Sequence, residues 1–161
     1  MLNKRKLEEA RNRLRSNDSA AASATALAII IAVLGVEGGY VNDPHDPGGE
    51  THYGVTKKTA REHGYQGDMK IMPKAVAVDI YDTTYITKYG YDPMLTIDPA
   101  VAKEMVDTTV NMGPTWPQRW LQQFLNKNCD AKLTVDGKAG PLTYEAYVQC
   151  QEAQGVVTVC R

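Results

Sequence analysis

The sequence has no excess of basic residues and few of the residues that bind metals or form disulfide frameworks. Its 18 lysines and arginines face 19 aspartates and glutamates, which gives a formal net charge of −1. Proteins that bind DNA or RNA usually present a basic face, so this balance argues against nucleic acid as the main partner. With three cysteines and no Cys-x-x-Cys or other zinc-ligand spacing, the chain predicts no metal site, and we expect no cofactor.

Internal repeats are also absent, and an alanine-rich run is the one low-complexity tract. A length of 161 residues, with 43% hydrophobic and 23% charged residues, fits one compact domain with a buried core. This composition excludes wholesale disorder.

Charge is distributed unevenly along the chain. Residues 1–18 form a basic segment with six cations and three acids, whereas the remaining 143 residues hold twelve cations and sixteen acids. The eighteen residues Ser19–Val36 carry no charge at all. As a helix this run would be about 27 Å long, slightly less than the hydrocarbon core of a bilayer at about 30 Å. We therefore favour a weakly hydrophobic membrane anchor, with its N-terminus in the cytoplasm because the cations precede it.

Two other interpretations of Ser19–Val36 stay open. A helix in the core of a soluble domain would explain the apolar stripe formed by Leu27, Ile30, Ile31 and Leu34, although such a helix usually carries charges on its other face. A cleavable signal peptide would need a small-x-small site after the apolar stretch, and the sequence there only approximates one.

Turn and capping residues predict a chain that is mostly helical after residue 56. The expected helices cover 57–63, 73–89, 99–113, 117–128 and 141–153. Strand signals are confined to Tyr40–Val55 and to the tail Val156–Val159. We expect an all-α fold with at most one small β-hairpin, near the loop that follows residue 37.

The residues with the clearest chemical potential lie in the loop-like stretch 37–56. Glu37 follows an apolar helix, where desolvation is expected to raise the carboxyl pKa, as a general acid requires. Asp46 lies on a Pro- and Gly-rich loop and should stay ionised, and the Thr51 hydroxyl could hold a water. These three groups are the parts needed to hydrolyse a glycosidic bond. The residue types alone also allow a helix-end carboxylate, a turn residue and a hairpin residue.

The same stretch strongly resembles the opening motif of the glycoside hydrolase family 108 muramidases. In that family Glu-Gly-Gly-Tyr leads into Pro-x-Asp-x-Gly-Gly-x-Thr and then into Tyr-Gly-(Val/Ile)-Thr. The matching residues are Glu37, Gly38, Gly39, Tyr40, Pro44, Asp46, Gly48, Gly49, Thr51, Tyr53, Gly54, Val55 and Thr56. The resemblance continues more loosely to about residue 150, and its second half is similar to the family's peptidoglycan-binding-like region.

The resemblance implies a lysozyme-like fold that cleaves the β-1,4 bond between N-acetylmuramic acid and N-acetylglucosamine in peptidoglycan, with Glu37 as the catalytic acid. The order Glu, Asp, Thr is also similar to the phage-type lysozyme triad, which assigns Asp46 and Thr51 to the activation of water. We prefer an inverting outcome, which a carboxyl separation above about 6 Å would support. The implied organisation is a catalytic region, 37–98, and a peptidoglycan-binding-like helical region, 99–161, in one compact fold.

The chain departs from the family before the motif, where relatives usually carry a charged amphipathic helix. The uncharged run 19–36 instead resembles the signal-anchor-release segment of some phage endolysins. It implies a monomer held inactive on the periplasmic side of the host inner membrane, then released into the periplasm to cut glycan strands and lyse the wall. A lytic transglycosylase, an inactive wall-binding module and a membrane-resident holin-like factor remain as alternatives.

Several aromatic residues are close enough to the motif to contact a sugar. Tyr40, His52, Tyr53 and Tyr85 are the candidate substrate-binding residues, although tyrosines at helical spacing also fit a core. We expect Trp116 and Trp120 to be packing residues.

The three cysteines leave at least one thiol unpaired. The helices that end near Asn128 and Ala153 are expected to run antiparallel, which would separate Cys129 from Cys150. If the domain is exported, we therefore expect a disulfide from Cys160 to one of these two residues.

Overall fold

Helices form most of the regular structure in the computed structural model, which describes residues 22–36, 38–45, 47 and 49–154. They are α2 (Lys57–Glu62), α3 (Lys74–Tyr85), α4 (Asp92–Ile97), α5 (Pro99–Met112), α6 (Thr115–Asn128) and α7 (Pro141–Gln154). Shorter turns are a π-helix, η1 (Ile30–Leu34), and two 3-10 helices, η2 (Met69–Ile71) and η3 (Thr87–Tyr89). Within these residues β1 (Thr51–His52) and β2 (Val55–Thr56) form one hairpin, which confirms the expected all-α, lysozyme-like fold.

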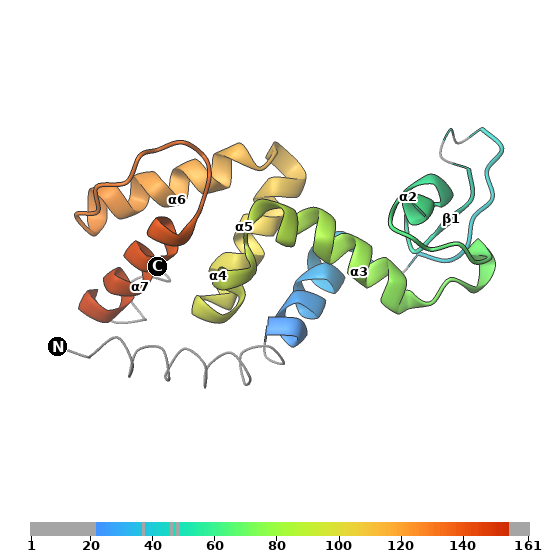
Figure 1. Cartoon of the computed structure of the whole chain (residues 1–161), viewed down its shortest axis with the longest axis horizontal. Helices are drawn as coiled ribbons and strands as arrows, with labels where there is room; N and C mark the ends of the chain where they lie inside the picture. The colour runs from blue at the N-terminus through green and yellow to red at the C-terminus, as the bar shows by residue number, and fades with distance from the viewer. Residues whose placement is uncertain (1–21, 37, 46, 48, 155–161) are drawn as a thin grey trace.

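The elements lie in a row (Figure 1). The hairpin and α2 occupy one end, α3 runs through the middle, and α6 and α7 occupy the other end. The helical residues 22–34 lie against α3 and α5. The hairpin and the α6–α7 pair are thus separated by the length of α3.

Capping residues place several helix ends where the sequence predicts them. The Thr56 side chain accepts a hydrogen bond from the Thr59 N–H, 3.1 Å, at the start of α2. Asp98 does the same for the Val101 N–H, 3.2 Å, at the start of α5. Helix α6 begins two residues before the expected Pro117. Helix α4 is not among the expected helices; it is only six residues long, and burial of two of its side chains fixes it in place.

The described part of the apolar N-terminal run, residues 22–36, packs into the core. Residues 22–29 are α-helical and continue into the π-helical turn η1. Ile29 and Ile30 are buried against the core, whereas Leu27 and Ile31 are 42% and 38% exposed. Among the described residues, no helix is both long enough and apolar enough to cross a membrane. The basic segment 1–18, the start of the run and the tail Val156–Val159 lie outside these residues, and the anchor stays a prediction.

Three amide side chains of α6, Gln118, Gln122 and Asn126, form hydrogen bonds with the loop 131–139 that follows the helix. Gln122 is 2% exposed, and its carbonyl accepts a hydrogen bond from the Gly137 N–H, 3.0 Å. These bonds draw the loop back along α6, so α7 starts beside the middle of α6 and runs in the same general direction.

This direction corrects the expected cysteine pairing. The structure joins Cys129 to Cys150, with their Cα atoms 5.6 Å apart. The antiparallel arrangement is wrong because the returning loop places Thr143, near the start of α7, within 3.4 Å of Gln122. Cys150, further along α7, then reaches the end of α6. Cys160 lies outside the described residues.

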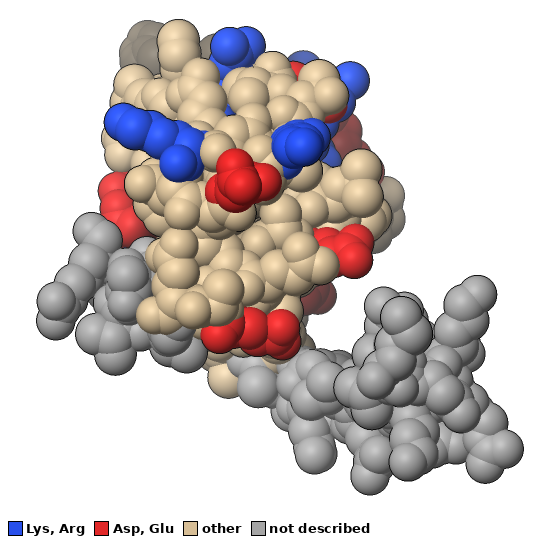
Figure 2. All heavy atoms as spheres, turned by 90° about the vertical axis from the view of Figure 1, so that its left-hand side faces the viewer, with Lys and Arg blue, Asp and Glu red and all other residues tan. Residues whose placement is uncertain are grey.

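The α6–α7 end of the molecule does not carry charge of one sign (Figure 2). Lys and Arg side chains gather on the upper part of this face, where α6 and its following loop lie, and Asp and Glu side chains lie below them.

Candidate active site

The hairpin explains the Tyr-Gly-Val-Thr part of the motif. Strand β1 pairs antiparallel with β2 so that His52 faces Val55, which leaves Tyr53 and Gly54 as a two-residue turn. Both turn residues have positive φ, 52° and 76°, as the turns favoured in two-residue hairpins require. A Cβ at position 54 would lie 2.7 Å from the Tyr81 hydroxyl, so glycine is favoured there for space as well as for conformation.

Hydrogen bonds hold the hairpin on both sides. The Tyr81 hydroxyl on α3 donates to the Tyr53 carbonyl, 2.9 Å, and the Tyr53 N–H donates to the Gly38 carbonyl, 3.1 Å. Val41 and Thr51 exchange two backbone hydrogen bonds, each 2.8 Å. The segment 38–41 is therefore fixed against the hairpin, and the two ends of the loop between Val41 and Thr51 are joined.

Glu37 and Asp46, the two predicted carboxylates, lie outside the described residues, so their roles and the inverting outcome stay predictions. The described residues on each side of Glu37 are both anchored: Val36 is fully buried in the core, and Gly38 accepts the hydrogen bond from Tyr53. The third predicted catalytic residue, Thr51, lies half-buried on β1 opposite Thr56.

Three of the four candidate substrate-binding residues lie together. The rings of His52 and Tyr53 are stacked 4.2 Å apart, and Tyr40 meets His52 edge-on at 6.2 Å. His52 is only 9% exposed and its Nδ1 is hydrogen-bonded to the Met69 carbonyl, so Tyr40 and Tyr53 present more of their surface than His52 does. Tyr85 lies apart on α3, with its ring 6.3 Å from that of Tyr81.

Glu50 is a residue of this region that the sequence reasoning missed. Its carboxylate accepts a hydrogen bond from the Tyr40 hydroxyl, 2.7 Å, and lies 3.9 Å from the Lys57 ammonium. The bond to Glu50 raises the pKa of Tyr40 to about 12, because the hydrogen bond favours the protonated hydroxyl. The Lys70 ammonium lies over the Tyr40 ring, 5.7 Å from its centre. Glu50 occupies the variable position x of the Gly-Gly-x-Thr motif. The spacing of the motif does not show that Tyr40, across the loop, is its hydrogen-bond partner.

The cavities of the described residues include two that lie away from the motif. One of about 910 Å³ lies between α4 and the start of α7, and another of about 330 Å³ lies between α5, α6 and α7. No group of three or more His, Cys, Asp or Glu side chains in the described ranges is arranged to hold a metal ion.

Comparison with known proteins identifies the family. The profile of the family described as Glycosyl hydrolase 108 matches residues 30–113, just over half of the chain, and this range includes the hairpin and all three predicted catalytic residues. A search of curated proteins found no match. The chain therefore belongs to glycosyl hydrolase family 108 and is a glycoside hydrolase with a glycan substrate.

Proposed function

We propose that this protein hydrolyses the β-1,4 bond between N-acetylmuramic acid and N-acetylglucosamine in peptidoglycan and so lyses the bacterial wall as an endolysin. The observation that supports the proposal is the family match across the motif, together with the anchoring of the residues on each side of Glu37. A catalytic acid must be held within a few tenths of an ångström of its productive position, and a chain fixed at both neighbours meets part of that requirement.

In this proposal Glu37 protonates the leaving oxygen, and Asp46, helped by Thr51, activates the water that attacks the anomeric carbon. Tyr40 and Tyr53 contact the sugar rings, and Tyr85, which lies apart on α3, contacts a more distant part of the glycan. His52 supports the Tyr53 ring by stacking beneath it, which agrees with its burial.

Replacement of the acid tests the assignment. Glu37→Gln should lower the rate of lysis of purified walls by about 10²–10⁴-fold, because an amide cannot donate the proton to the leaving group. The matched control is Glu62→Gln, an exposed carboxylate on α2, which should retain the wild-type rate. Unchanged lysis by a folded Glu37→Gln protein would refute the assignment.

We further propose that residues 19–36 tether the inactive enzyme to the inner membrane, on its periplasmic side, before release into the periplasm. The exposure of Leu27 and Ile31 supports this, because apolar side chains on the outer face of the helix are not needed for packing in the domain but would favour insertion into a bilayer. Fractionation of cells before and after depolarisation of the membrane should show the protein moving from the membrane to the periplasm. A protein that is soluble throughout would refute the tether.

A further inference from the structure

Helix α6 buries amides and exposes aromatic rings. Gln118, Gln122 and Asn126 face the returning loop, whereas Trp116 and Trp120 are 49% and 46% exposed. The two stripes lie on opposite sides of the helix, since each repeats every four residues and they are offset by two. The expectation that Trp116 and Trp120 are packing residues is therefore wrong.

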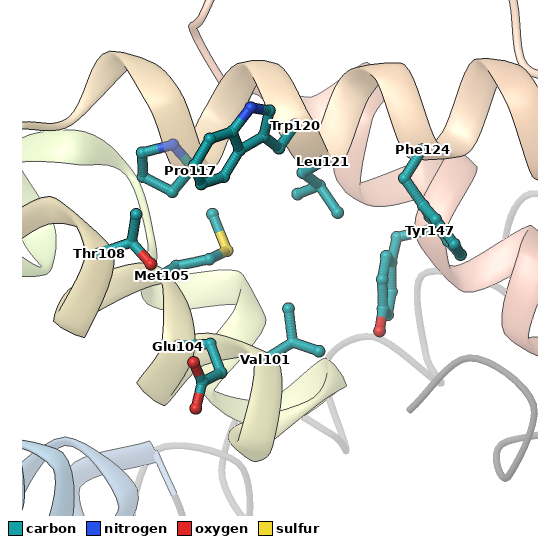
Figure 3. Close-up of a pocket in the computed structure, with 9 residues that line it drawn as sticks. All are labelled: Val101, Glu104, Met105, Thr108, Pro117, Trp120, Leu121, Phe124 and Tyr147. Atoms are coloured by element: carbon teal, nitrogen blue, oxygen red, sulfur yellow. The ribbon is translucent and has the colours of Figure 1, made fainter. Parts of the chain in front are cut away.

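The exposed tryptophans adjoin a cavity. Their rings are 6.0 Å apart, and Trp120 also lines the cavity of about 330 Å³ between α5, α6 and α7. Figure 3 shows Trp120 on α6 above this cavity, Met105 and Leu121 within it, and Glu104 on α5 at the lower rim. The site thus combines an apolar floor, an aromatic wall and a carboxylate.

The one charged group of the cavity is a carboxylate, which favours a cationic ligand. Glu104 is the one charged side chain among the nine described residues that line the cavity, and no ion pair joins it to a cation within the part of the chain that the structure describes. Arg119 precedes Trp120 on α6, but its side-chain carbons lie near Gly137, on the side of the helix that faces the loop. Aliphatic chains that end in an ammonium suit such a site, since the methylenes cover apolar surface while the cation meets a carboxylate and an indole face.

We propose that this cavity binds the stem peptide of peptidoglycan through its diamino acid. The aliphatic part of the diamino acid lies over Met105 and Leu121 beside Trp120, and its side-chain ammonium pairs with the Glu104 carboxylate, while a carboxylate on the same carbon points to solvent. The inference rests on the proposed function, because a polymer with a stem peptide on each muramic acid can engage the α5–α7 cavity while another part of the same strand lies at the distant hairpin.

Intrinsic fluorescence reports on this site directly, because both tryptophans of the chain are here. The titrants are a disaccharide–tripeptide that ends in the diamino acid and the matching disaccharide–dipeptide that lacks it. We expect saturable binding of the tripeptide at least about tenfold tighter than that of the dipeptide, and a loss of about tenfold for the tripeptide in Glu104→Gln. Glu145→Gln, an exposed carboxylate on α7 that lines a different cavity, should bind as the wild type does.

Equal affinity for the two ligands would overturn the proposal and indicate a surface for sugar rings instead. Wild-type affinity of Glu104→Gln for the tripeptide would also overturn it. Cleavage of glycan strands stripped of peptides separates this proposal from the proposed function: Glu104→Gln should cleave them at the wild-type rate, and Glu37→Gln should not. Loss of lysis in Glu37→Gln without tripeptide binding by the wild type would overturn the stem-peptide site alone.

Discussion

The two ends of the molecule are held together by different means. At the hairpin end the motif residues are fixed mainly by backbone hydrogen bonds, Tyr53 to Gly38 and Val41 to Thr51, with one Tyr81 hydroxyl joining them to α3. At the α6–α7 end the loop and the helices are fixed by buried side-chain amides and by a disulfide.

The difference separates activity from stability. At the hairpin end Tyr40, Glu50, Thr51 and Tyr53 are only partly buried. Substitution of these residues should therefore change the geometry around the candidate site at little cost to folding. The α6–α7 end has the buried polar network and the covalent link, so its substitutions should destabilise the domain while the folded molecules still cleave glycan.

Removal of the disulfide should have the largest effect on stability. Cys129→Ala combined with Cys150→Ala opens a loop with a sequence separation of 21 residues, which predicts a loss of about 3 kcal/mol in the free energy of unfolding. Denaturant unfolding measures this loss, and the rate per folded molecule on peptide-free glycan should be unchanged. If Cys160→Ala were instead the destabilising variant, the pairing would be wrong.

Loss of the central amide should have the next largest effect. The Gln122 side chain bonds to Asp136, Lys138, Thr143 and the Gly137 N–H. Gln122→Ala leaves buried groups without partners, and we expect a loss of about 2–3 kcal/mol. Thermal unfolding measures it, with the exposed neighbour Gln123→Ala as the control. If Gln122→Ala changed the stability only slightly but abolished cleavage, the α6–α7 end would serve activity rather than stability, which would contradict the contrast between the two ends.

At the hairpin end, the Tyr40–Glu50 pair should matter for rate more than for folding. Glu50→Gln weakens the hydrogen bond across the base of the loop that carries Asp46, and we expect about a fivefold lower rate of wall lysis with less than about 1 kcal/mol lost in stability. Lys57→Met, which removes the exposed contact of 3.9 Å to the same carboxylate, should change neither quantity measurably. A rate for Glu50→Gln equal to that of Lys57→Met would contradict the positioning role.

The smallest expected effect depends on pH and lies on α3, between the two ends. Burial raises the pKa of the Asp82 carboxyl, with repulsion from Asp92 and Asp79 adding to it, and one of its oxygens is buried without a hydrogen bond. The native state therefore holds this proton more tightly than the unfolded state, so the stability contributed by the group falls as pH rises above its ordinary value of 3.8.

Asp82→Asn should consequently raise the melting temperature at neutral pH by less than about 3 °C. The gain should shrink below about pH 4, where the aspartate is protonated in both states. A gain that grows as the pH is lowered would contradict the sign of the pKa shift.

Local signals predicted the helices well, because caps and first-turn prolines act within a few residues. Asp98-Pro99 at the start of α5 and Thr56 at the start of α2 are examples. The small helix α4 also has a first-turn proline, Pro93, but it lacks a side-chain cap and is only six residues long. Burial of Met94 and Leu95 stabilises it, and that burial depends on contacts that its own sequence does not show.

Long-range contacts account for the rest. The pairing of Cys129 with Cys150 depends on the loop 131–139, which the α6 amides hold against the helix. The Tyr40–Glu50 bond depends on the backbone pairing of Val41 with Thr51, which joins the two ends of the loop between them. The motif marked the candidate site because its glycines and turn residues are local requirements. It could not reveal that α6 exposes its tryptophans, since the opposite face of that helix is buried by polar contacts formed far along the chain.

The most direct test of the proposed function is the mass of the products released from purified peptidoglycan. The wild-type protein should release fragments that each contain one added water and end in a reducing N-acetylmuramic acid, and Glu37→Gln should release almost none. Fragments that end in an anhydro sugar would identify a lytic transglycosylase instead. Fragments ending in a reducing N-acetylglucosamine, or full activity of Glu37→Gln, would contradict the account.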